Sequence, residues 1–127
     1  MARSTRRSKR KYTGGKYHKD RKKKQRELAR VTNYVSIGKR AIKIKRTLGG
    51  NRKVTLLRQD FVNAYDPKTK KYLKLKIESV EENLANKGFE RSNIITKGAI
   101  VKTEKGRVKV TSRPGQHGVI NGVLLEE

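Results

Sequence analysis

The chain has 127 residues and a formal net charge of +24 at pH 7, from 35 Lys and Arg against 11 Asp and Glu. This length predicts one domain with room for an appendage. The sequence has no apolar run near the roughly 18 residues of a membrane-spanning helix, no apolar segment typical of an export signal, and no cysteine for disulfides or thiolate metal sites. We therefore expect a soluble intracellular protein.

The N-terminal segment cannot build a core. Residues 1–30 hold fourteen basic and two acidic residues, and only six apolar or aromatic ones. Burying so few side chains cannot offset about 1–2 kcal/mol of backbone entropy per ordered residue. High net charge with low apolar content is typical of a segment that is disordered alone and folds on a partner. We predict a basic arm over residues 1–33, disordered when free, and a folded domain over 34–127.

Hydrophobic residues beyond the arm alternate with a period of two, which predicts half-buried strands. Ile42 and Ile44 alternate with lysines, and Leu73, Leu75 and Ile77 do the same further on. The expected strands cover residues 41–46, 53–59, 60–65, 72–80, 98–103, 107–112 and 118–125. Many short strands at this spacing indicate a mostly β fold, a small barrel or sandwich, with lysines on its outer face.

Turn signals separate these runs. The expected turns cover residues 48–51, 66–71, 104–106 and 113–118, and Pro67 is suited to the second position of a type I turn. One helical turn is expected at 79–88, because Ser79 and Glu82 have the spacing of a capping box and Gly88 can end a helix.

The charge indicates a polyanionic partner. Nineteen of the 24 excess positive charges lie in the first 60 residues. Such a charge repels itself, and a polyanion removes the penalty while released counterions drive association. Nucleic acid is the leading candidate. An anionic membrane surface is the weaker one, because the basic run has no apolar face that could insert.

Candidate contact residues in the arm combine basic side chains with glycines, tyrosines and a histidine. Arginine offers a planar fork to phosphate, a Gly-Gly pair permits close backbone approach, and aromatic rings can stack on bases. The arm candidates are Arg3, Arg6, Arg7, Lys9, Arg10, Lys11, Tyr12, Thr13, Gly14, Gly15, Lys16, Tyr17, His18, Lys19, Arg21, Lys22, Lys23, Lys24, Arg26 and Arg30. A solubilising tail without ordered contacts is the alternative interpretation.

A second group of candidates surrounds a Gly-Gly turn in the domain. They are Arg46, Gly49, Gly50, Asn51, Arg52 and Lys53. Loops of this kind expose backbone N–H groups to an anion. An ordinary hairpin turn with solvated charges explains the same residues.

Catalytic residues are scarce. The two histidines, His18 and His117, lie far apart in the chain, and Glu78, Glu81 and Glu82 are better suited to solvation or helix capping than to metal binding. No catalytic triad, phosphate-binding loop or metal-ligand pair is visible. We predict no enzymatic activity, no metal and no cofactor.

Three stretches resemble a known family: "KYTGGKYHKDRKKKQREL" (11–28), "IGKRAIKIKRTLGGNRK" (37–53) and "NIITKGAIVKTEKGRVKVTSRPGQHGVINGVLLEE" (93–127). They are similar to the small-subunit ribosomal protein family numbered eight of archaea and eukaryotes, in its short archaeal form. The bacterial protein of that number is unrelated. The resemblance implies a six-stranded barrel-like domain whose extended basic arm is threaded into ribosomal RNA.

The resemblance also assigns contacts. It implies RNA contacts from Thr13, Gly14, Gly15 and the basic residues between Lys16 and Arg26. In the domain the implied contacts are Gly49, Gly50, Asn51, Arg52, Arg113 and Gln116, and Arg40 is a further candidate contact. Two positions depart from the family pattern: Ala29 stands where Gly is usual, and Leu48 where Arg is common. A backbone that needs positive φ at residue 29 would be strained by alanine.

We therefore expect a structural constituent of the small ribosomal subunit, located in the cytoplasm, that binds and stabilises folded ribosomal RNA by phosphate neutralisation. Its expected partners are small-subunit ribosomal RNA and neighbouring ribosomal proteins, with no membrane and no small-molecule substrate. A DNA-compacting basic protein is the alternative, since it shares the charge argument but not the partner.

Overall fold

A computed structural model describes residues 4–29 and 32–125. The chain divides into two compact units, residues 1–32 and 33–127. Within the described residues, regular structure lies mostly in the second unit and is mostly β, as the sequence predicts. None of the described helices has the length and apolar character needed to cross a membrane.

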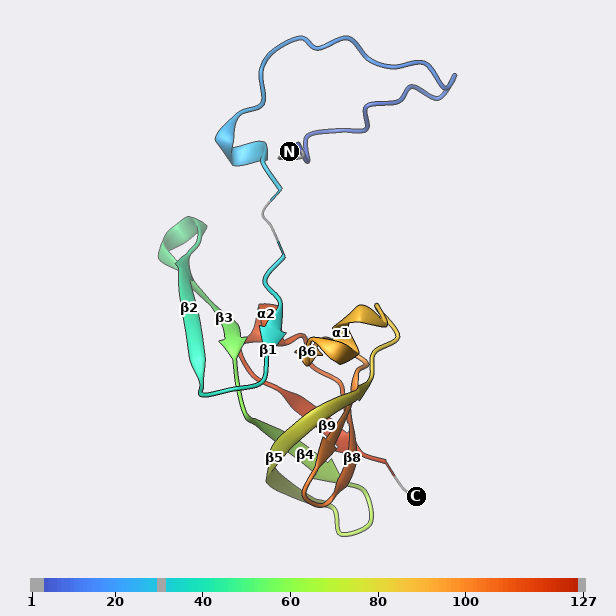
Figure 1. Cartoon of the computed structure of the whole chain (residues 1–127). Helices are drawn as coiled ribbons and strands as arrows, with labels where there is room; N and C mark the ends of the chain where they lie inside the picture. Colours follow the sequence, from blue (N-terminus) through green and yellow to red (C-terminus); the bar gives the residue numbers. More distant parts are fainter. Residues whose placement is uncertain (1–3, 30–31, 126–127) are drawn as a thin grey trace. The chain divides into compact units, whose positions relative to one another are not determined.

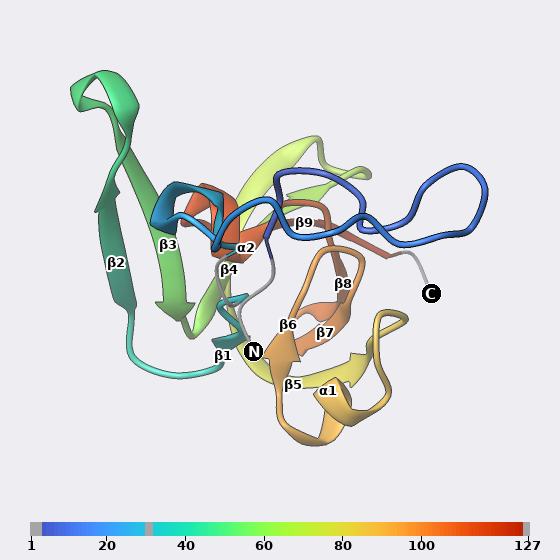
Figure 2. The same cartoon turned by 90° about the horizontal axis from the view of Figure 1, so that it is seen from above.

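A closed β-barrel forms the body of the second unit (Figures 1 and 2). Among the described residues its strands are β4 (Phe61–Asp66), β5 (Lys71–Glu82), β7 (Ile100–Thr103), β8 (Gly106–Val110) and β9 (Asn121–Leu124). Each strand pairs antiparallel with the next one in this order, and β9 closes the barrel by pairing parallel with β4. Closure leaves the barrel without an edge strand.

A second sheet has the strand order β2-β3-β1-β6. Its strands are β1 (Val35–Ser36), β2 (Ala41–Arg46), β3 (Arg52–Arg58) and β6 (Ile94–Ile95). The short helices are η1 (Gln25–Glu27), η2 (Leu48–Gly50), α1 (Gly88–Arg91) and α2 (Pro114–His117). In both views the β2–β3 hairpin extends away from the barrel, with η2 at its tip (Figures 1 and 2).

The core follows from the period-two pattern, because one face of each barrel strand points inward. Val62 and Ala64 on β4 are buried with Leu75 and Ile77 on β5. The other buried apolar residues are Val35, Leu56, Val80, Ile95, Ala99, Val101, Val108, Val110 and Ile120. Burying a side chain of this size contributes roughly 1.5–3 kcal/mol relative to leaving it exposed.

The predicted strands correspond to β2, β3, β4, β5, β7, β8 and β9. The closed barrel has five strands where the resemblance implied six, because the β2–β3 hairpin pairs with β1 in a separate sheet. The two-residue strands β1 and β6 were not predicted from the sequence, since they are too short to show an alternation.

The predicted helical turn at 79–88 is wrong. Residues 79–82 continue β5, where Ser79 lies opposite Lys102 and Val80 opposite Val101. Val80 is buried in the core, so tertiary packing outweighs the local capping signal. Gly88 begins the helix α1 and does not end one.

The alternation over residues 41–46 correctly predicts a strand but not its burial. Ile42 and Ile44 are 44% and 57% exposed. They lie on β2, the edge strand of the second sheet, in the hairpin that extends from the barrel (Figure 1). Because β2 lies beyond the core, its apolar face is left uncovered.

Buried hydrogen bonds connect the end of β5 to α1 and β6. The side chain of Asn83 donates to the Ile94 carbonyl at 3.1 Å and accepts bonds from Ala85 N–H at 3.1 Å and Thr96 Oγ1 at 2.9 Å. Its backbone N–H donates to Glu90 Oε1 at 2.9 Å. Asn83 is only 3% exposed, so one side chain satisfies several groups that water reaches poorly.

Candidate nucleic-acid interface

Residues 4–29 form an open loop whose two sides meet through backbone hydrogen bonds. Thr5 N–H donates to the Glu27 carbonyl at 2.8 Å, and Tyr17 N–H donates to the Lys9 carbonyl at 3.0 Å. Lys11 N–H donates to the Gly15 carbonyl at 2.7 Å and closes the turn that holds Tyr12, Thr13 and Gly14. The chain therefore turns back at the glycine pair.

No residue in this loop is buried. Ser4, Glu27 and Leu28 are partly exposed, and every other residue from 5 to 26 and at 29 is exposed. The loop is held by hydrogen bonds and ion pairs without a hydrophobic contribution of its own. Arg26 lies in the short helix η1, and Lys24 precedes it. Ala29 is not among the described non-glycine residues with positive φ, so the strain expected there is absent.

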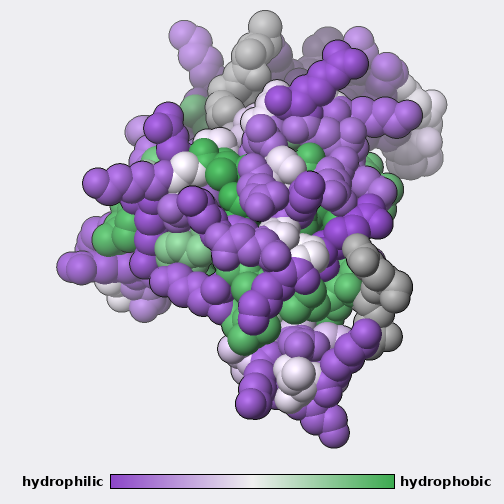
Figure 3. Space-filling model, turned by 60° about the horizontal axis from the view of Figure 1, so that its bottom comes forward, coloured by the Kyte–Doolittle hydropathy of each residue, from purple (hydrophilic) through white to green (hydrophobic). Residues whose placement is uncertain are grey.

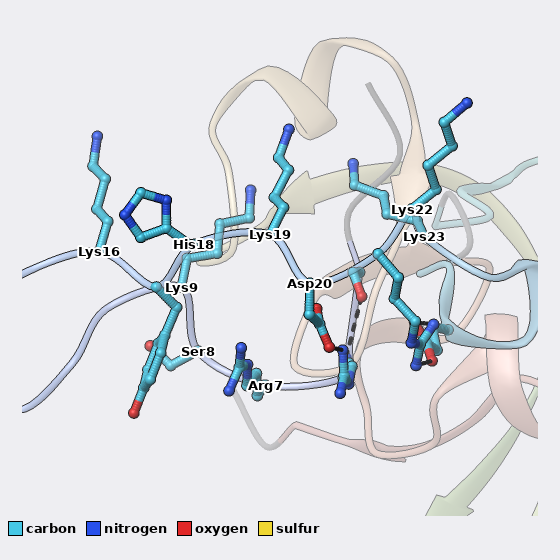
Figure 4. Close-up of a pocket in the computed structure, with 14 residues that line it drawn as sticks. Arg7, Ser8, Lys9, Lys16, His18, Lys19, Asp20, Lys22 and Lys23 are labelled. Carbon is cyan, nitrogen blue, oxygen red and sulfur yellow. Dashed lines mark hydrogen bonds and ion pairs between the residues drawn. The ribbon is translucent and has the colours of Figure 1, made fainter.

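A hollow of about 700 Å³ lies within the loop (Figure 4). It is lined by Ser4, Arg6, Arg7, Ser8, Lys9, Lys16, Tyr17, His18, Lys19, Asp20, Arg21, Lys22, Lys23 and Glu27. Eight of these residues are basic and two are acidic. The lining therefore has an excess of positive charge, and half of the predicted arm contacts meet around one space.

The two acids of the arm each hold one arginine. Arg6 Nη1 lies 2.6 Å from Asp20 Oδ2, and Arg21 Nη2 lies 2.5 Å from Glu27 Oε1. The Arg6 hydrogen bond lowers the pKa of Asp20, and the Arg21 hydrogen bond lowers the pKa of Glu27. In Figure 4, Lys16 and Lys19 extend away from Asp20. The acids thus position two arginines and leave the hollow with a positive excess.

The tyrosines of the arm differ in their surroundings. The Arg7 guanidinium lies 4.2 Å from the centroid of the Tyr17 ring, and Lys11 Nζ lies 5.6 Å from it. Such cation–π contacts hold the Tyr17 ring beside the Arg7 and Lys11 side chains. Tyr12, in contrast, is fully exposed at the turn. Tyr12 therefore offers a whole ring face to an unpaired base, whereas Tyr17 organises the cations around it.

The tip of the β2–β3 hairpin concentrates positive charge on paired positions. Lys45 lies opposite Lys53, and Arg46 lies opposite Arg52. Like charges directly across an antiparallel pair destabilise a hairpin. Beyond the tip, hydrophilic side chains cover most of the face of the molecule that Figure 3 shows. An anion at the tip would remove this repulsion, as expected of an interface for a polyanion.

The turn at this tip depends on glycine. Gly49 and Gly50 have φ values of 78° and 77°, which other residues rarely adopt. Thr47 N–H donates to the Asn51 carbonyl at 2.7 Å, and Asn51 Nδ2 donates to the Leu48 carbonyl at 3.3 Å. Leu48 is 96% exposed at the tip. The turn is thus stabilised internally while its apolar side chain points outward.

Helix α2 brings two of the predicted contacts together. Lys53 Nζ on β3 donates a hydrogen bond to Gln116 Oε1 on α2. Gly118 ends α2 with φ of 74°, and a Cβ there would lie 2.7 Å from Val54 Cγ1. A side chain at 118 would therefore push α2 off β3. We call Lys45, Arg46, Arg52, Lys53 and Gln116 the hairpin cluster.

Other predicted contacts lie elsewhere. Arg113 precedes α2, and its backbone N–H lies 3.3 Å from His117 Nδ1. Arg40 is exposed at the opposite end of β2 from Arg46, so it does not join the hairpin cluster. Arg3 and Arg30 lie outside the described residues. Lys45 is not among the residues predicted from the sequence, although the alternation over 41–46 and the turn at 48–51 together place it opposite Lys53.

Two acidic residues of the domain, Glu81 and Glu82, form ion pairs with Arg107. Arg107 Nε lies 2.7 Å from Glu81 Oε2, and Arg107 Nη2 lies 3.3 Å from Glu82 Oε1. Within residues 4–29 and 32–125, no group of three or more His, Cys, Asp and Glu side chains could hold a metal ion. Glu81 and Glu82 instead hold the side chain of Arg107 on the barrel surface.

Comparisons with known proteins identify the family of the chain. The family model described as Ribosomal protein S8e matches residues 4–125. The chain is 51% identical over 120 residues to the small ribosomal subunit protein eS8 of Methanospirillum hungatei, covering 94% of this chain and 96% of that relative. It is 49% identical over 114 residues to the protein of the same name from Nanoarchaeum equitans, covering 90% of each chain. A match that includes both the arm and the barrel shows that the chain belongs to the ribosomal protein S8e family.

Proposed function

We propose that this chain binds folded small-subunit ribosomal RNA and stabilises it by neutralising phosphates. The observation that carries the proposal is the composition of the arm loop: eight basic residues line one hollow, while no described residue of the arm is buried. The contacts within such a loop do not explain why it concentrates positive charge. Phosphates supply the opposite charge that makes the arrangement favourable.

Membership in the family gives the chain a structural ribosomal role and not an enzymatic one. The relatives are named as small ribosomal subunit proteins. We infer that this chain likewise assembles into the small subunit of the cytoplasmic ribosome, with ribosomal RNA and neighbouring ribosomal proteins as its partners.

The proposed mechanism is electrostatic. Phosphate oxygens compete with Asp20 and Glu27 for the guanidinium groups of Arg6 and Arg21. In the free protein these two acids already orient the guanidinium groups. Other cations around the hollow follow the RNA backbone, and the hairpin cluster forms a second contact from the domain. Each neutralised phosphate releases condensed counterions, so entropy contributes to affinity.

Salt dependence tests this mechanism. If about ten phosphates are neutralised, the logarithm of the affinity for purified small-subunit ribosomal RNA falls with the logarithm of salt concentration at a slope of about −7 to −9. A slope shallower than about −3 would contradict the proposal, because it corresponds to very few neutralised phosphates.

Competition with DNA provides the control for the choice of partner. Duplex DNA with the same number of phosphates should displace the protein from ribosomal RNA poorly at physiological salt, because DNA lacks the folded shape. Equal competition would favour the alternative of a DNA-compacting protein.

A further inference from the structure

The outer face of the β4–β5 pair carries aromatic and basic side chains that the arm and the hairpin cluster do not involve. Three cross-strand pairs line this face: Phe61 with Lys76, Asn63 with Lys74, and Tyr65 with Tyr72. The intervening pairs, Val62 with Leu75 and Ala64 with Leu73, point toward the core. We call the residues Phe61, Asn63, Tyr65, Tyr72, Lys74 and Lys76 the β4–β5 platform.

One aromatic ring of the platform, that of Tyr72, is presented to solvent, whereas Phe61 and Tyr65 are partly buried. Tyr72 is 80% exposed, and its ring centroid lies 5.2 Å from that of Tyr65 at an interplanar angle of 47°. Lys74 Nζ lies 3.9 Å from the centroid of the Phe61 ring. The tyrosine pair fixes one ring beside the other, so Tyr72 offers a flat surface at low entropic cost.

An amide pair extends the platform onto the neighbouring strand. Asn121 on β9 lies opposite Asn63, and Asn63 Nδ2 donates to Asn121 Oδ1 at 3.0 Å. Both residues are exposed. Amide groups can hydrogen-bond to the edges of nucleobases, where donors and acceptors alternate.

The charge around the platform is positive. Lys71, Lys74 and Lys76 are exposed on β5. The nearby carboxylate of Asp66 is bound within its own turn, by Lys68 N–H at 3.0 Å and Thr69 Oγ1 at 2.8 Å. The Thr69 hydrogen bond lowers the pKa of Asp66. The face therefore combines one exposed ring with lysines and amides, which suits a planar ligand that also carries negative charge.

We infer that the β4–β5 platform binds unpaired nucleotides of RNA. Exposed rings on a sheet stack on bases of any sequence, and adjacent lysines contact the backbone phosphates. A fully paired RNA helix offers no free base face, so it gains nothing from the rings. A protein partner fits less well, because the lysines interrupt the apolar surface. The inference rests on the proposed function and names a second, chemically different contact.

Binding of the full chain to two probes tests the platform: polyuridine, which is single-stranded, and a fully paired RNA duplex with the same number of phosphates. Tyr72→Ala should weaken polyuridine binding about tenfold, which corresponds to one lost stacking contact. Binding to the duplex should not change. Tyr72→Phe keeps the ring and is the matched control, so it should bind both probes like the unaltered protein.

Each other outcome has a defined meaning. Equal effects of Tyr72→Ala on both probes, or no effect on either, would overturn the platform but leave the steep salt dependence intact. A shallow salt slope of the unaltered protein would instead contradict the proposed function. Lys74→Gln gives a second test that leaves both tyrosines in place: it should weaken polyuridine binding and lower the salt slope by about one.

The same position distinguishes RNA from a protein partner. A photo-reactive residue in place of Tyr72, in chains assembled into small subunits, should crosslink to RNA at an unpaired nucleotide. Crosslinking to a neighbouring protein alone would overturn the inference and assign the face to that protein.

Discussion

At the scale of single residues, the hairpin cluster shows a conflict between stability and binding. Arg46 and Arg52 lie directly opposite each other, as do Lys45 and Lys53. Of the two pairs, only Lys45–Lys53 has a described hydrogen bond to another group, the one from Lys53 to Gln116. In the free protein this arrangement costs stability. An anionic partner would turn the same charges into a favourable contact.

We predict that Arg52→Gln weakens binding to small-subunit ribosomal RNA and lowers the salt slope by about one. The same change should leave the thermal midpoint unchanged or raise the free energy of unfolding by a few tenths of a kcal/mol, because the repulsion with Arg46 is lost. Arg91→Gln is the matched control, since Arg91 is exposed in α1 outside the hairpin cluster. Equal losses of affinity in both variants would contradict a role specific to the hairpin.

The ion pairs of the arm have a defined pH dependence. Arg6 and Arg21 lower the pKa of Asp20 and Glu27 from ordinary values of 3.8 and 4.5. A lowered pKa means that the pairs stabilise the loop fully above these values. Their contribution to stability decreases as the pH falls below these ordinary values. It is lost as the pH falls through the lowered pKa of each acid.

NMR titration of the side-chain carboxyl carbons should therefore place both midpoints below 3.8 for Asp20 and 4.5 for Glu27. Arg6→Gln should return the Asp20 midpoint toward its ordinary value and leave that of Glu27 nearly unchanged. An unaltered Asp20 midpoint in this variant would show that the Arg6–Asp20 pair is absent in solution.

At the scale of elements, local signals and tertiary contacts disagree at the end of β5. The sequence suggests a helix start at Ser79, yet the chain continues as a strand to Glu82. Asn83 then ends the strand by binding groups from the following loop and from β6. The polar contacts of a buried amide thus replace the helix cap that the sequence suggests.

We predict that Asn83→Ala lowers the free energy of unfolding by about 1–3 kcal/mol, because the partly buried hydrogen-bonding groups of Ile94 and Thr96 lose their partner. Chemical denaturation measures the change. Leu84→Ala is the control at the neighbouring, 90% exposed position and should have little effect. Similar stability of both variants would show that the Asn83 hydrogen bonds contribute little.

At the scale of the whole molecule, the two units have different physical bases. The described buried apolar residues all lie between 35 and 120, and none lies in the arm. The second unit therefore has its own hydrophobic core. The described residues of the arm are instead held by hydrogen bonds, ion pairs and contacts of cations with Tyr17.

We predict that deleting residues 1–32 leaves a folded β domain with much weaker RNA binding and a shallower salt slope. Circular dichroism and thermal unfolding should show the same β signal and cooperativity as in the full chain, since no described core residue is removed. A truncated protein without β structure would show that the arm is part of the fold.

The sequence by itself determined the positions of the long strands and the concentration of charge. Both are local properties: alternation with a period of two specifies a strand, and a run of Lys and Arg is basic in any fold. The glycine pair at 49–50 likewise indicated its turn, because few other residues adopt positive φ.

Only the tertiary structure decided which faces are covered and which residues meet. Ile42 and Ile44 look like core residues but are exposed, because β2 is an edge strand beyond the barrel. Lys53 and Gln116 meet across 63 residues of sequence. Burial and long-range contacts depend on the layers that pack on each strand. A local pattern carries no information about those layers, so barrel closure and the packing of α2 on β3 had to be read from the structure.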